Sequence, residues 1–305
     1  MGKLSGLQSF GLIAFLVLAW GVSWPIYKVA IDYTPPLLFA GMRTVLGGLL
    51  FCILLFPRRR LIRWKQNWQV ILISAALNVV LFFGLQTVGL LLMPSGLFSV
   101  LVYFQPVLVG IFAWMWLGEP MTVSKLTGLI MGFMGVVAMS STGFSGHIAG
   151  IGIIIALLTG LSWALGTVYI KKEGHRVDSL WLVALQFLIG GIVLTAAGLM
   201  TEEWTSITWN APYLSGLGFG ILFGIIASWS IYFKLVKSGE ASQVASFTFL
   251  VPLIAVCIGT LFLKEPFTVN LVIGIILIGL SIYLVNHKST ALKQLQKATR
   301  SQHRV

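Results

Sequence analysis

Charged side chains are scarce in this sequence of 305 residues. Asp, Glu, Lys and Arg make up 9% of it, whereas 58% of the residues are hydrophobic; a soluble domain carries about 25% charged residues. The mean hydropathy is +0.97, and apolar runs of about 20 residues, the length that crosses a bilayer, recur along the chain. These proportions exclude an ordinary soluble fold and predict an all-α membrane protein.

Carboxylates are the scarcest charged groups, and none lies in the middle of an apolar run. The eight acidic residues all fall in predicted loops or at the ends of runs, and the four histidines lie outside the runs. Without a carboxylate or an imidazole inside the membrane, an intramembrane hydrolase would lack both a general base and a metal ligand. We therefore predict that the chain is not an enzyme and has no catalytic residue, no metal site and no cofactor.

Cysteine is also rare, and the net charge is +12. Cys52 and Cys257 both lie inside apolar runs, where their spacing suggests neither a loop disulfide nor a metal site. A strongly basic chain could bind nucleic acid, but these basic residues sit in short loops and in the tail with no basic domain behind them. Positive-inside bias explains them better, so the expected partner is the lipid bilayer and not nucleic acid.

Ten membrane spans are predicted from the apolar runs. Their connections are short, so consecutive spans should be neighbours in the fold. The predicted spans cover about residues 9–31, 36–56, 68–91, 95–116, 122–140, 148–170, 179–200, 213–234, 241–262 and 268–286.

Lys and Arg predict the orientation of these spans. With the N-terminus in the cytoplasm, 17 of the 20 basic residues fall on the cytoplasmic side, including Arg58-Arg59-Arg60. Lys28 and Lys264 fall outside, and Arg43 lies within a span. This bias predicts a multi-pass protein of the cell (plasma) membrane with both termini in the cytoplasm, where residues 288–305 form a basic tail.

The sequence repeats itself once. The stretch Leu117-Gly118-Glu119-Pro120-x-Thr122 returns 146 residues later as Leu263-Lys264-Glu265-Pro266-x-Thr268, and Leu46-Gly47-Gly48 returns as Ile189-Gly190-Gly191. Spans one to five thus repeat as spans six to ten, and because five is odd the two halves face opposite ways. We expect inverted five-helix repeats at residues 1–141 and 142–287, an architecture typical of secondary transporters with a site near the midplane.

The repeated Glu-Pro turn is interpreted as a structural corner. The predicted topology puts Glu119 in the cytoplasm and Glu265 outside, a membrane apart, so the two cannot form a pair of catalytic carboxylates. Proline at about the first helical position and the acid before it both favour the start of a helix. The motif should therefore turn span four into span five and span nine into span ten.

With these features the chain resembles the EamA branch of the drug/metabolite transporter superfamily. The resemblance is carried by Trp20-Gly21-x-Ser23-Trp24, by Arg43 in span two and by the turns at Glu119 and Glu265, and it covers about residues 9–286. It implies ten helices in inverted halves and, often, efflux of amino acids or related metabolites. Gln186 stands in the second half where Arg43 stands in the first, so the role of these side chains should be asymmetric.

We accordingly expect a secondary transporter that moves small amphipathic metabolites, amino acids or related compounds, out of the cell by alternating access, as a monomer or a homodimer. The lack of an intramembrane carboxylate favours facilitated exchange or downhill efflux over carboxylate-based coupling. The alternatives are a drug or lipid-like efflux carrier and a non-transporting membrane sensor or structural protein. A channel is disfavoured because no ring of like charges or filter-like repeat is present.

Aromatic and polar side chains at helical spacing predict the wall of a substrate cavity. Polar groups in lipid are costly unless they face protein or water, so spans one, three, four, six, eight and nine should surround the cavity. The alternatives are that the tryptophans anchor the interface and that the hydroxyls join helices. The candidates are Trp20, Trp24, Asn78, Phe82, Gln86, Tyr103, Gln105, Trp163, Thr167, Trp229, Tyr232 and Phe249.

Arg43 is the one charge clearly inside a span, roughly 10 Å from its outer end at 1.5 Å per residue. It either attracts a carboxylate of the substrate, as a possible anion contact, or forms a structural pair with Asp32 or with backbone carbonyls of a neighbouring helix. Pro25, Pro106 and Pro252 remove helix hydrogen bonds in spans one, four and nine. They are candidates for gating kinks, and the alternative is a static kink that only shapes each helix.

Overall fold

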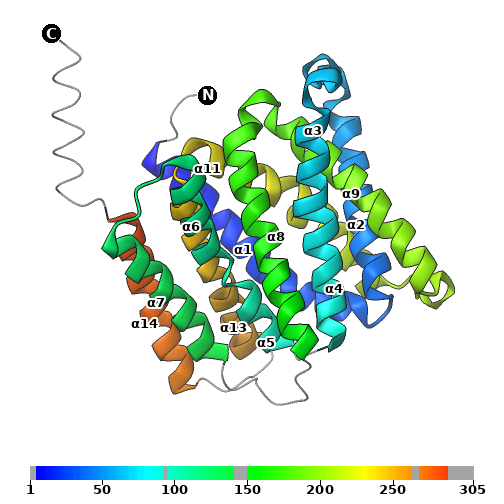
Figure 1. Cartoon of the computed structure of the whole chain (residues 1–305). Coiled ribbons are helices and arrows are strands. Elements are labelled where there is room, and N and C mark those ends of the chain that lie inside the picture. The colour runs from blue at the N-terminus through cyan, green and yellow to red at the C-terminus, as the bar shows by residue number, and fades with distance from the viewer. Residues whose placement is uncertain (1–4, 93–94, 141–149, 263–267, 288–305) are drawn as a thin grey trace, which may run out of the picture.

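A computed structural model describes residues 5–92, 95–140, 150–262 and 268–287, without the side chains of Trp24, Pro25, Lys28 and a few others. All regular structure in these ranges is helical, and they contain no strand (Figure 1). The helices are α1 (Gly6–Ile31), α2 (Pro36–Leu55), η1 (Phe56–Leu61), α3 (Trp64–Ala75), η2 (Ala76–Leu81), α4 (Phe82–Leu92), α5 (Ser95–Val102), α6 (Gln105–Leu117), α7 (Val123–Ser140), α8 (Gly150–Glu173), η4 (Gly174–Arg176), α9 (Ser179–Thr201), η5 (Trp204–Ser206), α10 (Ala211–Phe219), η6 (Gly220–Ala227), α11 (Ser228–Ser238), α12 (Ala241–Ser246), η7 (Phe247–Phe249), α13 (Leu250–Phe262) and α14 (Val269–Asn286).

Length and composition make most of these helices suitable for a bilayer. Within the described ranges, eight helical stretches are long and apolar enough to cross one, and two shorter apolar stretches, Val123–Ala138 and Ala241–Ala255, accompany them. Large apolar side chains such as Leu18, Trp114 and Ile154 are exposed on the surface. Such a surface suits lipid, which requires all backbone polar groups to be satisfied within the helices.

Local signals explain where several helices begin and end. Ser5 and Gln8 form a capping box at the start of α1, and the Asp178 carboxylate accepts hydrogen bonds from the first turn of α9. Thr268 caps α14 in the same way. Gly118 ends α6 with a φ of +67°, a left-handed conformation that glycine adopts without steric cost.

One flank of the molecule is the close pair of α2 and α9. A Cβ added at Gly48 would lie 2.2 Å from the backbone nitrogen of Leu188, and one added at Gly191 would lie 2.3 Å from the backbone nitrogen of Val45. Glycine is therefore needed on both helices for their backbones to touch. The two contacts correspond under the sequence repeat, because Val45 matches Leu188 and Gly48 matches Gly191.

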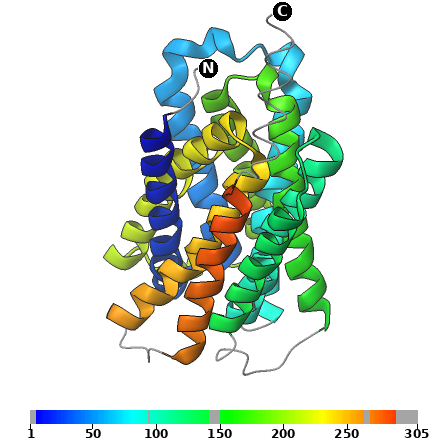
Figure 2. The same cartoon turned by 90° about the vertical axis from the view of Figure 1, so that its left-hand side faces the viewer.

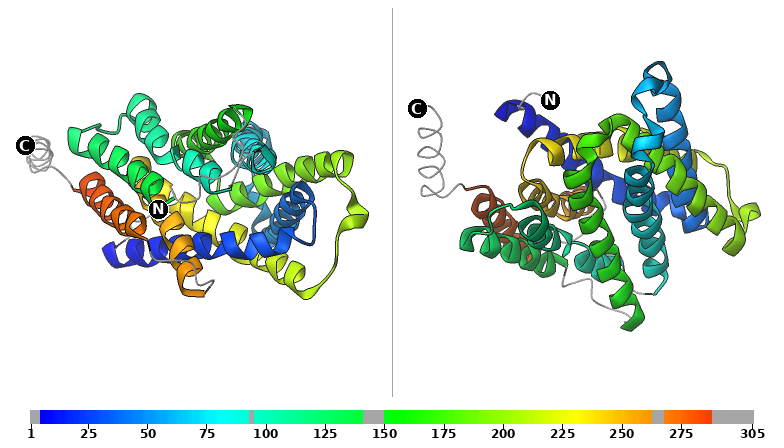
Figure 3. Two further views of the ribbon diagram at one scale, coloured as in Figure 1. Left: turned by 90° about the horizontal axis from the view of Figure 1, so that it is seen from below. Right: turned by 45° about the horizontal axis from the view of Figure 1, so that its top comes forward.

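The opposite flank is the pair of α7 and α14 (Figures 2 and 3). A Cβ added at Gly128 would lie 3.0 Å from the carbonyl oxygen of Ser281, and one added at Gly135 would lie 3.1 Å from that of Gly274. These contacts also correspond under the repeat, since Gly128 matches Gly274 and Gly135 matches Ser281. The remaining long helices lie between the two flanking pairs.

Spans four and nine each consist of more than one helical segment. Span four breaks at Tyr103 and Phe104, between α5 and α6, and Pro106 is the second residue of α6. Span nine changes from α12 through the single 3₁₀ turn η7 into α13, where Pro252 is the third residue. Because proline tolerates the first turn of a helix, both prolines start a new helical segment instead of kinking an existing one.

Spans three and eight contain π-helical segments, η2 and η6, that the sequence does not predict. A π-helix shifts the backbone hydrogen bonds by one residue and frees carbonyl groups for other donors. The Ser162 hydroxyl of α8 donates to one of these carbonyls, that of Leu77, at 2.6 Å. The Ser228 hydroxyl donates to the carbonyl of Phe223 in η6.

The first Glu-Pro corner does more than turn one helix into the next. Glu119 does not cap α7, as its position before that helix suggests; its carboxylate accepts hydrogen bonds from the backbone N–H groups of Ala241 and Ser242, at 2.6 and 3.2 Å, and from the Ser242 hydroxyl. The side chain is buried. It therefore caps α12, a helix more than 120 residues away in the sequence. The second corner, with Glu265, lies outside the described residues.

Candidate functional site

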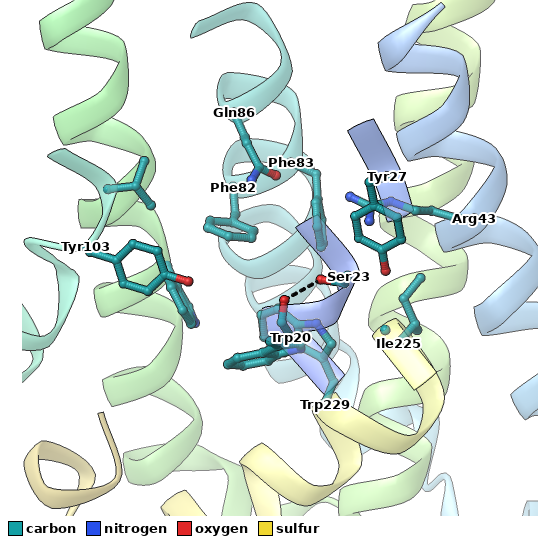
Figure 4. A pocket seen from close by; sticks show the side chains of 13 residues that line it. Trp20, Ser23, Tyr27, Arg43, Phe82, Phe83, Gln86, Tyr103, Ile225 and Trp229 are labelled. Atoms are coloured by element: carbon teal, nitrogen blue, oxygen red, sulfur yellow. Dashed lines mark hydrogen bonds between the residues drawn. The ribbon is translucent and has the colours of Figure 1, made fainter. Parts of the chain in front are cut away.

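A cavity lies among the helices of the bundle (Figure 4). It holds about 630 Å³ of space free of protein atoms, its mouth included. Both halves of the sequence contribute to its wall. The lining residues are Trp20, Ser23 and Tyr27 of α1, Arg43 of α2, Phe82, Phe83 and Gln86 of α4, Val102 of α5, Tyr103 beside it, Trp163 of α8, Gly224 and Ile225 of η6, and Trp229 of α11.

The cavity lies toward one end of the bundle, away from the end at which basic residues gather. The turns that carry Arg58–Arg60, Lys171 and Lys237 lie together at one end, which we call the basic end; α3 begins there and α8 and α11 end there (Figure 1). Arg43 lies near the first turns of α2, and Tyr27 near the last turn of α1, both toward the opposite end. The lining residues nearest the basic end are Trp20 and Trp229, below Phe82 and Gln86 in Figure 4.

The boundary of the cavity toward the basic end is a cluster of aromatic rings, which we call the aromatic floor: Trp20, Trp163, Trp229 and Tyr232. The Trp20 ring centroid lies 5.6 Å from that of Trp163, 5.8 Å from that of Trp229 and 5.4 Å from that of Tyr232. Tilted and edge-to-face rings at this spacing attract one another. Three helical segments, α1 from the first half of the chain and α8 and α11 from the second, therefore meet through one cluster.

Small residues bring the helices close enough to form this site. Gly160 of α8 lies against Val102, where an added Cβ would be 2.9 Å from its carbonyl oxygen, and Gly224 of η6 lies against the Tyr27 hydroxyl. The Ser23 hydroxyl bonds back to the Trp20 carbonyl at 2.7 Å, so it is satisfied within α1.

Arg43 presents a positive charge to the cavity without a carboxylate beside it. The side chain is 7% exposed, and its guanidinium carbon lies 4.3, 4.8 and 5.4 Å from the ring centroids of Tyr27, Phe83 and Phe39. These are cation–π distances. Asp32 is exposed and forms no ion pair with Arg43. Among the described residues, no backbone carbonyl accepts a hydrogen bond from the Arg43 side chain, and the Nε of Arg43 has no hydrogen-bond partner. The structural pairs considered from the sequence are therefore not formed.

Of the predicted cavity residues, Trp20, Phe82, Gln86, Tyr103, Trp163 and Trp229 line the cavity together with Arg43. Asn78, Gln105, Thr167 and Phe249 are buried elsewhere, and Tyr232 is buried in the aromatic floor. Thr167 and Tyr232 share a hydrogen bond of 2.9 Å on the far side of the floor, Asn78 packs against Gly166, and Phe249 fills the space beside Gly132 of α7. The side chains of Trp24 and Pro25 lie outside the described part.

Sequence reasoning missed six lining residues, and two of them have a clear local signal. Ser23 and Tyr27 follow Trp20 by one and two helical turns on the same face of α1. Phe83, Val102, Gly224 and Ile225 enter the wall through the packing of distant helices. Span two joins the wall through Arg43, and no described side chain of span nine does so, which differs from the predicted set of helices.

Polar contacts join helices at the basic end, one group between the two halves of the chain and one within the second half. Lys125 of α7 lies 2.7 Å from the Glu240 carboxylate and 2.9 Å from the Ser242 hydroxyl, next to the Glu119 cap of α12. Lys237 donates to the carbonyl of Val177 at 3.2 Å and to the Ser179 hydroxyl at 2.8 Å. Together these contacts join α7, α9, α11 and α12 at that end.

The described residues include no acidic side chain in the cavity wall and no cluster of His, Cys, Asp or Glu that could hold a metal ion. The cavity therefore offers aromatic surface, a few hydrogen-bonding groups and one cation. Such a site can bind and orient a small amphipathic molecule.

Comparison with known proteins places this architecture in a family. Residues 9–141 and 150–287 each match the EamA-like transporter family. The chain is 54% identical to the uncharacterized transporter YvbV of Bacillus subtilis over 96% of both chains, and 29% identical to the uncharacterized transporter YoaV of the same organism over 90% of this chain and 94% of that one. A crystal structure with a TM-score of 0.77 and 18% identity covers 92% of this chain and 97% of its own, and shows that the fold is a known one. The chain belongs to the EamA-like transporter family and is a multi-pass membrane transporter.

Proposed function

We propose that the protein is a secondary transporter that carries small amphipathic metabolites, amino acids or related compounds, out of the cell by alternating access. The observation that carries the proposal is the cavity: aromatic, lined from both halves of the chain, and bounded toward the basic end by the aromatic floor. A solute bound there lies between the two ends of the bundle, as a carrier requires.

The proposed architecture is ten spans in two inverted repeats, residues 1–141 and 142–287. The two matches to one family model, at residues 9–141 and 150–287, support a duplication. Reciprocal contacts support a two-fold relation between the halves. Between α2 and α9, the contact of Gly48 with Leu188 corresponds under the repeat to the contact of Gly191 with Val45. Between α7 and α14, the contact of Gly128 with Ser281 corresponds to the contact of Gly135 with Gly274. Positive-inside bias supports a cell-membrane orientation in which the basic end faces the cytoplasm.

Alternating access would follow from this symmetry. In the conformation described, contacts at the basic end and the aromatic floor separate the cavity from the proposed cytoplasmic side. Exchanging the conformations of the two halves would open that side and close the other. The helix starts at Pro106 and Pro252, in the two spans that correspond under the repeat, are the proposed points of bending.

The cavity wall suggests facilitated exchange or downhill efflux. Proton-coupled and Na⁺-coupled carriers commonly use an intramembrane carboxylate, and the described wall has none. Accumulation against a gradient should therefore not depend strictly on a proton or sodium gradient.

Counterflow in proteoliposomes tests the proposal. Liposomes with purified protein are loaded with an unlabelled candidate solute, and entry of the labelled solute is measured across a panel of amino acids, their derivatives and cationic drugs. We expect transient accumulation for at least one amphipathic metabolite. If folded protein exchanges none of them, the carrier assignment fails; exchange of cationic drugs alone would favour a drug efflux carrier.

A further inference from the structure

The proposed function leaves open which chemical group of the solute the cavity recognises. The two ends of the cavity offer different side chains for this recognition. Arg43 and Tyr27 lie at one side of it and Tyr103 at the other, with Phe82, Phe83 and Trp20 between them (Figure 4). One end is thus cationic and can donate hydrogen bonds, while the rest of the wall is mainly aromatic.

The cation at that end is unusual because no carboxylate of the described residues neutralises it. Seven of the eight acidic residues are described, and their carboxylates either have other partners or are exposed: Glu119 caps α12, Glu240 pairs with Lys125, Asp178 caps α9 and Glu202 caps α2. A buried charge without a counter-ion is costly, and aromatic faces offset only part of that cost. A ligand carboxylate would supply the missing counter-ion.

The orphaned polar atoms of the wall point to the same class of ligand. Among the described side chains, Nε of Arg43 and Nε1 of Trp163 are buried without a hydrogen-bond partner. Both are donors only, so both require an acceptor. No acidic side chain lines the wall to bind an ammonium group, which Arg43 would also repel.

Resting on the proposed function, we propose that the transported solutes are carboxylates with a compact apolar body, and that Arg43 recognises the carboxylate while an α-ammonium group contributes nothing to binding. The guanidinium binds the carboxylate by charge-assisted hydrogen bonds. The apolar body extends from there along Phe82, Trp20 and Tyr103. Des-amino relatives of apolar amino acids, which keep the carboxylate, are then substrates at least as good as the amino acids themselves.

Two matched ligand series test this recognition. One contains 3-phenylpropanoate, L-phenylalanine, 3-phenylpropanamide and 2-phenylethylamine; the other contains 4-methylpentanoate, L-leucine, 4-methylpentanamide and 3-methylbutylamine. Binding to the purified full chain is measured by tryptophan fluorescence and by thermal stabilisation, and transport is measured separately by counterflow. Within each series the members differ in the charged group and keep the apolar body.

We expect both carboxylates of a series to bind, and the amide and the amine to bind about 10- to 100-fold more weakly, as for the loss of one charge-assisted interaction. Arg43→Gln should weaken carboxylate binding by that factor and leave amide binding unchanged. Arg43→Lys should retain part of the preference. Arg176→Gln, a change of the same charge at an exposed site, should change neither.

The results separate this inference from the proposed function. Three binding results overturn the inference, whatever counterflow shows. They are tighter binding of the amine or the amide than of the carboxylate, an unchanged preference for the carboxylate in a normally folded Arg43→Gln variant, and no binding of any carboxylate in either series. Arg43-dependent carboxylate binding without counterflow would support the recognition site and refute transport.

Discussion

The Glu119 cap of α12 should be a major contributor to stability at the basic end. Its carboxylate is buried and accepts three hydrogen bonds, two from backbone N–H groups and one from the Ser242 hydroxyl. Glu119→Ala would leave these donors without the acceptor and remove the charge that faces the start of α12.

The size of the effect can be bounded from these contacts. A hydrogen bond to a charged group contributes about 1.5–3 kcal/mol. Glu119 also lies 3.9 Å from the buried Lys125 ammonium, and removing one member of a buried ion pair costs about 3–5 kcal/mol. Lys125 keeps Glu240 at 2.7 Å, so it is not left unpaired, and the lower part of the range applies. We expect Glu119→Ala to lower the free energy of unfolding by about 3 kcal/mol, and Glu119→Gln, which retains one acceptor oxygen, by about half of that.

The assay is unfolding of the purified protein in mixed micelles with increasing SDS, followed by tryptophan fluorescence. Glu173→Ala is the matched control, because Glu173 pairs with Arg176 at 3.3 Å on the exposed surface of the same end, where an ion pair contributes about 0–1 kcal/mol. If Glu119→Ala is no more destabilising than Glu173→Ala, the cap does not hold α12 in place and this account of the basic end is wrong.

Three further substitutions test the packing of the fold in the same unfolding assay. Gly191→Ala places a Cβ 2.3 Å from the backbone of Val45 and should cost about 3 kcal/mol or more, whereas Gly218→Ala, with nothing within 4 Å, should be neutral or stabilise α10 by up to about 1 kcal/mol; equal effects would refute close packing of α2 on α9. Tyr232→Phe loses the bond to Thr167 and should cost about 0.5–1.5 kcal/mol without changing ligand affinity, so a large loss of affinity would mean that the hydroxyl reaches the solute. Ser162→Ala removes the donor to the Leu77 carbonyl in η2 and should cost about 1 kcal/mol; no cost would show that this carbonyl finds another partner.

Much of the fold is predictable from the sequence because the signals are local or repeated. Apolar length predicts the long helices, and the repeated glycines at 47–48 and 190–191 mark the helices that pack as α2 and α9. The helix breaks in spans four and nine are less predictable. Pro106 and Pro252 are compatible with either a kinked helix or a new helical start, and tertiary contacts decide between the two.

The candidate site is predictable in kind and not in detail. Aromatic residues at helical spacing indicate Trp20, Phe82 and Trp163, but Phe249 has the same local signal and fills the space beside Gly132 instead. The surroundings of Arg43 come from α1 and α4, and the partner of Glu119 is more than 120 residues away. No local pattern encodes such long-range pairings.

The central claim, a carrier site reached from one side at a time, is tested most directly by side-specific alkylation. In the full chain with Cys52 and Cys257 replaced, single cysteines are placed at Gln86, in the cavity wall, and at Thr167, beyond the aromatic floor. An impermeant maleimide is then added to intact cells or to inverted vesicles, with Glu119→Ala as a second background.

We expect the Gln86→Cys site to react from outside and the Thr167→Cys site only from the cytoplasmic side. Glu119→Ala should slow the first reaction and speed the second, because it weakens closure of the basic end. Reaction of one site from both sides at rates that Glu119→Ala does not change in opposite directions would indicate a channel, and no reaction of either site would indicate a sealed bundle; each result would contradict alternating access through this cavity.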